Sequence, residues 1–427
     1  MTLNDGFDRT VSGWLDEQAG RGRPDYLDEA LARTVQTRQR PWWASLERWL
    51  PVQSTLRLAP VPRIAWLLVV VALVAALGLA ALAIGSRHRQ PAPPFGPARN
   101  GAILYGGTDK DIHTFDPMTG TTATLISGLE GDRRPLLSPD GTRLLFLRDS
   151  ASRDQGFGPL QSMIMVANDD GSDVRPLTGP LTHFVVTVGN TAWSHDGTMV
   201  AVISDIGSKP AIQVFKVDGS SPPVVLDTNP LTDIGYMAFR PSGREITFRA
   251  SSADGSGLFA VGSHGGGYRV IVPATQTGGD GASLSPDGTK LAYQTWDGTL
   301  GVIHVVDVDT GVDLVPVFDP PSTATSVDDK PAWSPDGSRF LFVRYIVGDH
   351  NNLVVAPSTG GRRIEVGPAM PNESMRVDAE FSPDGSKVLA SYAADGSNWL
   401  LDPTGSTAGT RLPSSMAEVA SWQRLAP

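Results

Sequence analysis

A short segment ending in glycine recurs six times between residues 138 and 385, and this repeat constrains the fold more than any other feature of the chain. Four copies read Ser-Pro-Asp-Gly, and the other two read Ser-His-Asp-Gly and Arg-Pro-Ser-Gly. Their final glycines are 56, 46, 45, 49 and 48 residues apart, and periods of about 40–50 residues are typical of β-propellers and repeat arrays. The six copies, called tetrads below, are residues 138–141, 194–197, 240–243, 285–288, 334–337 and 382–385.

Each tetrad has the composition of a hairpin turn. Proline presets φ near −65° at the second position, aspartate tolerates the third, and glycine supplies a positive φ at the fourth. A short apolar run such as Ala332-Trp333 precedes the tetrad, and an alternating run with Phe340 and Phe342 follows it. Alternation with period two and aromatic enrichment indicates strands. A further apolar run, such as residues 353–356, and a last short strand complete a four-stranded unit.

The tetrads and their flanking strands resemble the WD-like repeats of TolB-type β-propellers over about residues 101–424. His195 and the pair Arg240 and Ser242 depart from the repeat, but the glycine is kept in every copy. The resemblance implies an all-β, TolB-like propeller, which we place at residues 100–425.

The two ends of this region predict how the ring closes. Residues 101–127 contain three strand-like runs with no tetrad before them, whereas residues 418–422 look like the run that precedes a tetrad, with Trp422 in the place of Trp333. We therefore expect the C-terminal strand to be the innermost strand of the first blade, which protects the sheet edges. Seven blades of about 46 residues match the period, and a six-bladed ring is the alternative.

An uncharged hydrophobic run precedes the repeat. Residues 64–84 contain no charged side chain, and 21 helical residues span about 31 Å, enough for a bilayer core. A signal peptide has a shorter apolar region nearer the N-terminus. We predict a single transmembrane helix flanked by Arg63 and Arg87, with Trp66 near one interface. Arginine counts on the two sides are equal, and we expect the N-terminus inside and the propeller outside, in a bacterial envelope.

The segments on either side of this span are short. Residues 1–62 are predicted to form short helices in a cytosolic segment, and residues 86–99 a Pro-rich linker. This layout also resembles membrane-bound anti-sigma factors. The chain has no Cys and its first His is His88, which excludes the zinc-bearing type, while a zinc-free regulator remains an open alternative.

The sequence contains few motifs that are associated with catalysis or metal binding. The chain has no G-x-S-x-G, H-E-x-x-H or P-loop pattern. Residues 263–267, Ser-His-Gly-Gly-Gly, resemble the oxyanion segment of some esterases, but their phase in the repeat predicts a turn. The Asp-rich residues 169–173 do not fit a calcium loop, and the histidines show no ligand spacing. We expect no catalytic, metal or cofactor site, and the sequence assigns no ligand-binding residue.

The net charge of the region after the predicted span disfavours some classes of binding partner. From residue 90 onward there are 24 Lys and Arg against 37 Asp and Glu. An acidic domain disfavours nucleic acid and anionic lipid surfaces. We expect a non-enzymatic, membrane-anchored binding or scaffold protein that presents loops to a protein or an envelope glycan. The alternatives are a transmembrane sensor or regulator acting through residues 1–62 and, second, a propeller enzyme.

Overall fold

The structure is a computed structural model of the whole chain, and it divides into two compact units, Met1–Ile84 and Gly85–Pro427. The described residues all belong to the second unit; they are 96–128, 130–149, 162–180, 190–206, 209–277, 281–296, 300–319, 326–346, 350–371, 377–393, 395–416 and 421–426. The predicted helical segment 1–62 and the predicted span 64–84 lie outside them. In the part of the chain that is described, no helix is long and apolar enough to cross a membrane.

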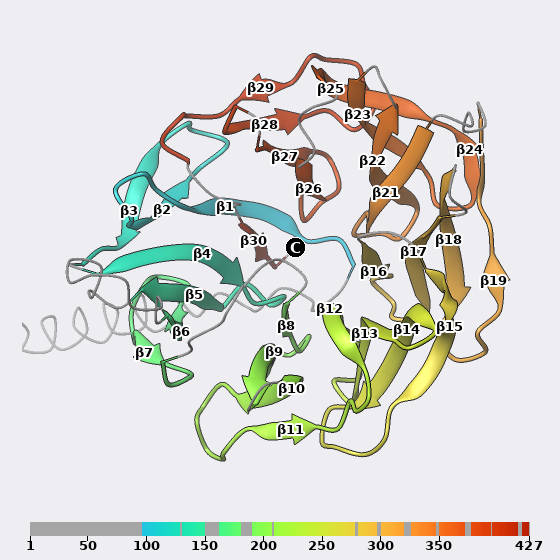
Figure 1. The fold of residues 1–427 in the computed structure, drawn as a ribbon. Coiled ribbons are helices and arrows are strands. Elements are labelled where there is room, and N and C mark those ends of the chain that lie inside the picture. The colour runs from blue at the N-terminus through green and yellow to red at the C-terminus, as the bar shows by residue number, and fades with distance from the viewer. Residues whose placement is uncertain are drawn as a thin grey trace, which may run out of the picture. The chain divides into compact units, whose positions relative to one another are not determined.

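The second unit is an all-β propeller whose sheets surround a common centre (Figure 1). Five of the sheets have four strands each and are called blades below. The first blade contains β1 (Arg99–Gly106), β2 (Ile112–Phe115), β3 (Thr122–Ile126) and β30 (Ser421–Leu425). The second contains β4 (Gly131–Leu137), β5 (Arg143–Asp149), β6 (Ser162–Asn168) and β7 (Arg175–Pro176). The third contains β8 (Thr191–Trp193), β9 (Met199–Ile206), β10 (Lys209–Lys216) and β11 (Val224–Leu226). The fourth contains β12 (Thr232–Phe239), β13 (Glu245–Ser252), β14 (Gly255–Gly262) and β15 (Arg269–Thr277). The last blade contains β26 (Val377–Phe381), β27 (Val388–Tyr392), β28 (Ser397–Leu401) and β29 (Thr410–Arg411).

The remaining strands form one large and one small sheet between the fourth and last blades. The eight-stranded sheet contains β16 (Ala282–Leu284), β17 (Lys290–Trp296), β18 (Gly301–Asp307), β19 (Asp313–Leu314), β21 (Ser326–Trp333), β22 (Arg339–Ile346), β23 (His350–Pro357) and β25 (Ile364–Pro371). Strands β20 (Val317–Asp319) and β24 (Gly360–Arg362) form a parallel pair.

The expectation of seven separate blades, or of six, is therefore wrong: the described residues form five separate four-stranded blades. The strands of two expected units are joined in the eight-stranded sheet through one parallel contact between β18 and β21, at Gly301 and Val327. The physical reason is the absence of a side chain at Gly301, where a Cβ would stand 2.5 Å from a methyl group of Val327. The bare backbone of Gly301 lets the neighbouring strand come within hydrogen-bonding reach.

The C-terminal strand completes the first blade. In the order β3-β2-β1-β30, β30 pairs antiparallel with β1, with Trp422 opposite Ile103. The Trp422 indole is 6% exposed and its Nε1–H donates to the carbonyl oxygen of Gly101 at 3.1 Å. It packs in an apolar cluster with Ile103 and with Leu389 of the last blade. Similar clusters lie between the other neighbouring sheets, so the core is distributed around the ring.

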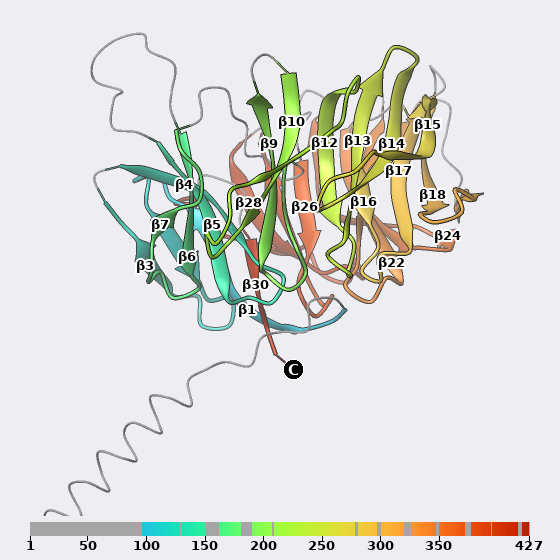
Figure 2. The ribbon, with the colours of Figure 1, turned by 90° about the horizontal axis from the view of Figure 1, so that it is seen from below.

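The tetrads form the turns between the innermost and second strands. All six tetrad glycines have φ between 64° and 72°. In the five copies that begin with serine, its Oγ–H donates to the aspartate at 2.5–2.7 Å, which holds the turn closed. The face of the ring on which these turns lie is called the tetrad face below. Figure 2, a side view of the sheets, shows the C-terminus on this face.

Candidate functional site

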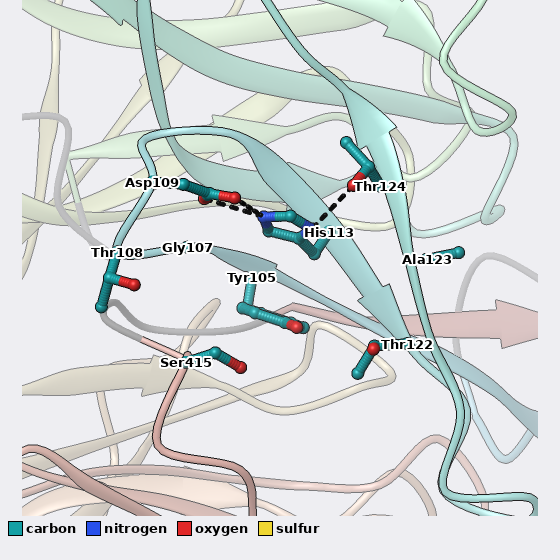
Figure 3. Close-up of a pocket in the computed structure, with 9 residues that line it drawn as sticks. All are labelled: Tyr105, Gly107, Thr108, Asp109, His113, Thr122, Ala123, Thr124 and Ser415. Atoms are coloured by element: carbon teal, nitrogen blue, oxygen red, sulfur yellow. Dashed lines mark hydrogen bonds and ion pairs between the residues drawn. The ribbon is translucent and has the colours of Figure 1, made fainter.

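A pocket of about 260 Å³ lies in the groove between the first blade and the segment that connects β29 to β30 (Figure 3). The first blade contributes the hairpin between β1 and β2 and the exposed side of β3, and the connecting segment contributes Ser415. An isolated antiparallel bridge between Gly107 and Met416 holds the hairpin against this segment. The pocket is therefore built where the two ends of the propeller sequence meet.

A hydrogen-bonded chain of three side chains lines one wall of the pocket. His113 Nε2 lies 2.9 and 3.0 Å from the two carboxylate oxygens of Asp109, and Nδ1 lies 3.3 Å from Thr124 Oγ1. Because a carboxylate only accepts, Nε2 carries the proton. The ring of Tyr105, opposite His113 across β1 and β2, stacks on the imidazole with centroids 5.4 Å apart. The imidazole is thus held from three sides, whereas 56% of the Asp109 side chain is exposed.

Asp109 is ionised at neutral pH. The hydrogen bond from His113 holds the pKa of the Asp109 carboxyl below its usual value, with a further contribution from the Asp111 amide, which donates at 3.2 Å. Gly107 makes room for this arrangement, because a Cβ there would stand 2.3 Å from Asp109 Oδ1 and 2.6 Å from His113 Nε2. The glycine is required for the carboxylate and imidazole to pack against the hairpin backbone.

Hydroxyl groups form the rest of the polar lining. Four side chains carry them, Thr108, Thr122, Thr124 and Ser415, and all four residues are exposed. No Lys or Arg is among the described residues that line the pocket. The site is therefore rich in hydrogen-bond acceptors and carries one negative charge. Its chemistry suits the binding of groups that donate hydrogen bonds.

A similar set of side chains recurs in the eight-stranded sheet. Tyr293 of β17 stands opposite His304 of β18, with ring centroids 5.5 Å apart, and His304 Nδ1 lies 2.6 Å from Asp313 Oδ2. Burial, assisted by the charge of Asp313, raises the pKa of the Tyr293 hydroxyl. These residues do not line the pocket, and they provide an internal comparison for it.

The segments singled out in the sequence lie elsewhere. Residues 263–267 follow β14 and form a turn, as predicted, in which Ser263 Oγ–H donates to the carbonyl oxygen of Gly243 at 2.8 Å. In the Asp-rich turn after β6, Asp170 accepts from the Ser172 amide at 2.9 Å and Asp169 accepts from Gln423 Nε2 at 3.0 Å. Within the described ranges, no three His, Asp or Glu side chains are arranged to hold a metal ion.

Sequence reasoning did not single out any residue of the pocket as a ligand-binding residue. One local signal was present: Asp109 and His113 stand four residues apart across a hairpin that begins at Gly107. The contribution of Ser415 had no such signal, because it comes from the other end of the propeller sequence.

Comparison with known proteins gives matches in structure only. No family model and no curated protein sequence matches the chain. Among solved structures, TolB from Acinetobacter baumannii is similar with 15% identity and a TM-score of 0.44, over 75% of this chain and 66% of that one, just under two thirds of its length. A putative TolB from Agrobacterium tumefaciens has 19% identity and a TM-score of 0.43, over 68% of this chain and 98% of that one. A nidogen/laminin complex matches with 10% identity and a TM-score of 0.40, over 60% of this chain and 89% of that one. These similarities concern the fold, and the assignment of the second unit as an all-β propeller follows from its own sheet order and register.

Proposed function

We propose that the protein is a non-enzymatic, membrane-anchored propeller that binds a protein or an envelope ligand through the face opposite the tetrads. The observation that carries the proposal is the position of the two ends of the propeller. The chain enters the propeller on the tetrad face and ends on the same face. The opposite face and its loops are then available to a partner.

Three hydrogen bonds fix the point of entry. The Ala98 amide donates to the carbonyl oxygen of Pro383 at 2.8 Å, and the Asp384 amide donates to Asn100 Oδ1 at 3.1 Å, so the start of β1 is tied to the last tetrad. Arg424 Nη2 donates to the carbonyl oxygen of Gly96 at 2.6 Å. From there the eight residues of β1 extend about 26 Å to the opposite face, where the hairpin of the pocket lies.

The proposed anchor is the uncharged run 64–84, which precedes this entry point in the sequence. A tether that joins the propeller on the tetrad face would not itself cover the loops of the opposite face. The acidic charge of the region from residue 90 onward favours neutral or basic partner surfaces over nucleic acid and anionic lipid.

The non-enzymatic part of the proposal is supported by the position of the esterase-like segment. Ser263 is buried and donates its hydroxyl proton to the backbone carbonyl of Gly243 in the tetrad 240–243. A hydroxyl used in this way is a structural group rather than an exposed nucleophile. The function we propose therefore rests on surface recognition.

Site-specific photo-crosslinking in membranes tests the proposal with the full-length chain. Benzoylphenylalanine is placed at Lys110 or Ser127, exposed positions on the opposite face, and at Met118 or Ser220, exposed positions on the tetrad face. We expect adducts with a partner from Lys110 and Ser127 and none from the matched tetrad-face positions. Adducts from the tetrad face alone, or none from either face, would overturn the proposal.

A further inference from the structure

We propose that the pocket between the first blade and Ser415 receives the ammonium or guanidinium group of a lysine or arginine side chain of a partner protein. The inference rests on the proposed function, because it names the chemistry that the binding face recognises. Three properties of the pocket support it: its charge, its hydrogen-bonding groups and its size.

The charge of the lining favours a cation. Asp109 is the one carboxylate among the described lining residues, and its side chain is 56% exposed to the pocket and solvent. Its ionised state is favoured by the His113 hydrogen bond, which lowers the pKa of the carboxyl. No Lys or Arg among those residues neutralises it. An anionic group, such as the carboxylate of a chain terminus, would be repelled, and a cation would be attracted.

The hydrogen-bonding groups favour a ligand that mainly donates. An ionised carboxylate offers about four acceptor sites, and His113 and the Asp111 amide use only part of this capacity. The hydroxyl oxygens of Thr122 and Ser415 can accept as well. An ammonium group has three donors and a guanidinium group has five, and neither has an acceptor. The lining and the proposed group therefore complement each other.

The size of the pocket favours a single side chain. Its volume of about 260 Å³ lies below the range of roughly 300–1,000 Å³ that is typical of sites for drug-sized molecules. A neutral sugar ring could also occupy this volume and donate hydrogen bonds, but it would leave the charge of Asp109 without a counter-charge. We therefore favour the basic side chain and treat the sugar as an outcome of the test.

The test uses the full-length chain in detergent micelles and ligand-observed NMR titrations. The probes are Nα-acetyl-lysine amide and Nα-acetyl-arginine amide, with Nα-acetyl-norleucine amide as the uncharged counterpart and maltotriose as the neutral sugar. We expect saturable binding of the two cationic probes, weaker at high salt because ions screen exposed charges. Asp109→Asn, which removes the charge and keeps the shape, should weaken that binding about tenfold or more.

Matched variants separate the pocket from general effects of charge. Asp313→Asn makes the same change at the similar Tyr–His–Asp set outside the pocket and should leave binding of the cationic probes unchanged. Thr122→Val removes one hydroxyl at nearly constant size and should weaken binding about two- to fivefold, which provides a second test if Asp109→Asn does not fold.

Several results would overturn the inference. They are equal binding of norleucine amide, binding of maltotriose without the cationic probes, and cationic binding that Asp109→Asn leaves intact. The result of this test can be distinguished from the result of the crosslinking test of the proposed function. Adducts from Lys110 or Ser127 that persist without any binding of the cationic probes would reject the basic side chain and retain the binding face.

Discussion

At the scale of single residues, the tetrad aspartate shows how one side chain closes a turn. Asp336 accepts from Ser334 Oγ at 2.6 Å, from the Ser338 amide at 3.1 Å and from Ser338 Oγ at 2.8 Å. Burial raises the pKa of Asp336, but these hydrogen bonds outweigh it and leave the pKa lowered. Such charge-assisted bonds contribute more than neutral ones. The arginine copy keeps its turn differently, since Arg240 pairs with Glu245 at 3.1 Å and with Asp309 at 2.7 Å.

The protonation state of Glu380 should make the stability of the propeller depend on pH. Glu380 is an exposed residue of β26, the innermost strand of the last blade, where the surrounding protein raises the pKa of its carboxyl to about 7 although the Trp422 amide donates to it. The folded pKa exceeds the unfolded value of about 4.5, so its stabilising contribution is fully present below that value and is lost as pH rises through about 7. We expect the thermal midpoint to fall between about pH 5 and pH 8, and to fall less in Glu380→Gln. Equal pH dependence in the two proteins, measured by circular dichroism, would contradict this role.

At the scale of elements, the tetrad turns contact one another around the ring, and glycine permits the contact. A Cβ on Gly288 would stand 2.1 Å from Cδ of Pro241 in the preceding tetrad. Gly219 has nearly the same backbone, with φ of 69° against 70°, but nothing lies within 4 Å of its Cβ position. A comparison of substitutions at the two glycines therefore distinguishes the cost of backbone strain from the cost of a steric clash.

We predict that Gly288→Ala destabilises the propeller more than Gly219→Ala. Both variants carry the cost of a left-handed backbone, about 1–2 kcal/mol, and only the first adds an overpacking cost of about 1–3 kcal/mol. Denaturant unfolding of the two variants beside the unsubstituted chain measures the difference. Indistinguishable free energies of unfolding would show that the tetrads do not support one another through this contact.

At the scale of the whole molecule, the pairing of β30 with β1 joins the two ends of the ring. Deleting residues 416–427 would remove β30 and leave an unpaired edge on β1, which can associate with other chains. We expect the truncated protein to unfold at a lower temperature or to aggregate. Trp422→Ala alone should cost about 3–5 kcal/mol, because its side chain is 6% exposed.

The matched control is Trp296→Ala at the end of β17, where the side chain is 43% exposed. Its effect should remain near 0.5 kcal/mol, roughly the range of surface substitutions. Thermal unfolding of the three variants side by side checks the prediction. A monomeric truncated protein with an unchanged midpoint would mean that the C-terminal strand does not hold the ring together.

The amino-acid sequence by itself was sufficient to predict the turns and strands of the repeating unit of this protein. Turn formation depends on adjacent residues, so the Pro-Asp-Gly series predicted hairpins, and the six glycines have the positive φ that those turns require. Alternating runs such as that of β22 predicted strands, because the pleat places successive side chains on opposite faces. From these local rules an all-β propeller followed.

Tertiary structure alone decided how the units are joined and where a pocket forms. The eight-stranded sheet depends on the approach of Val327 to the bare backbone of Gly301, a contact between strands of two different units. The pocket depends on Ser415 lining the same cavity as Asp109 and His113 across the closure of the ring. Neither is encoded by spacing along the chain, because each arises from how closely two backbones pack after the units have formed.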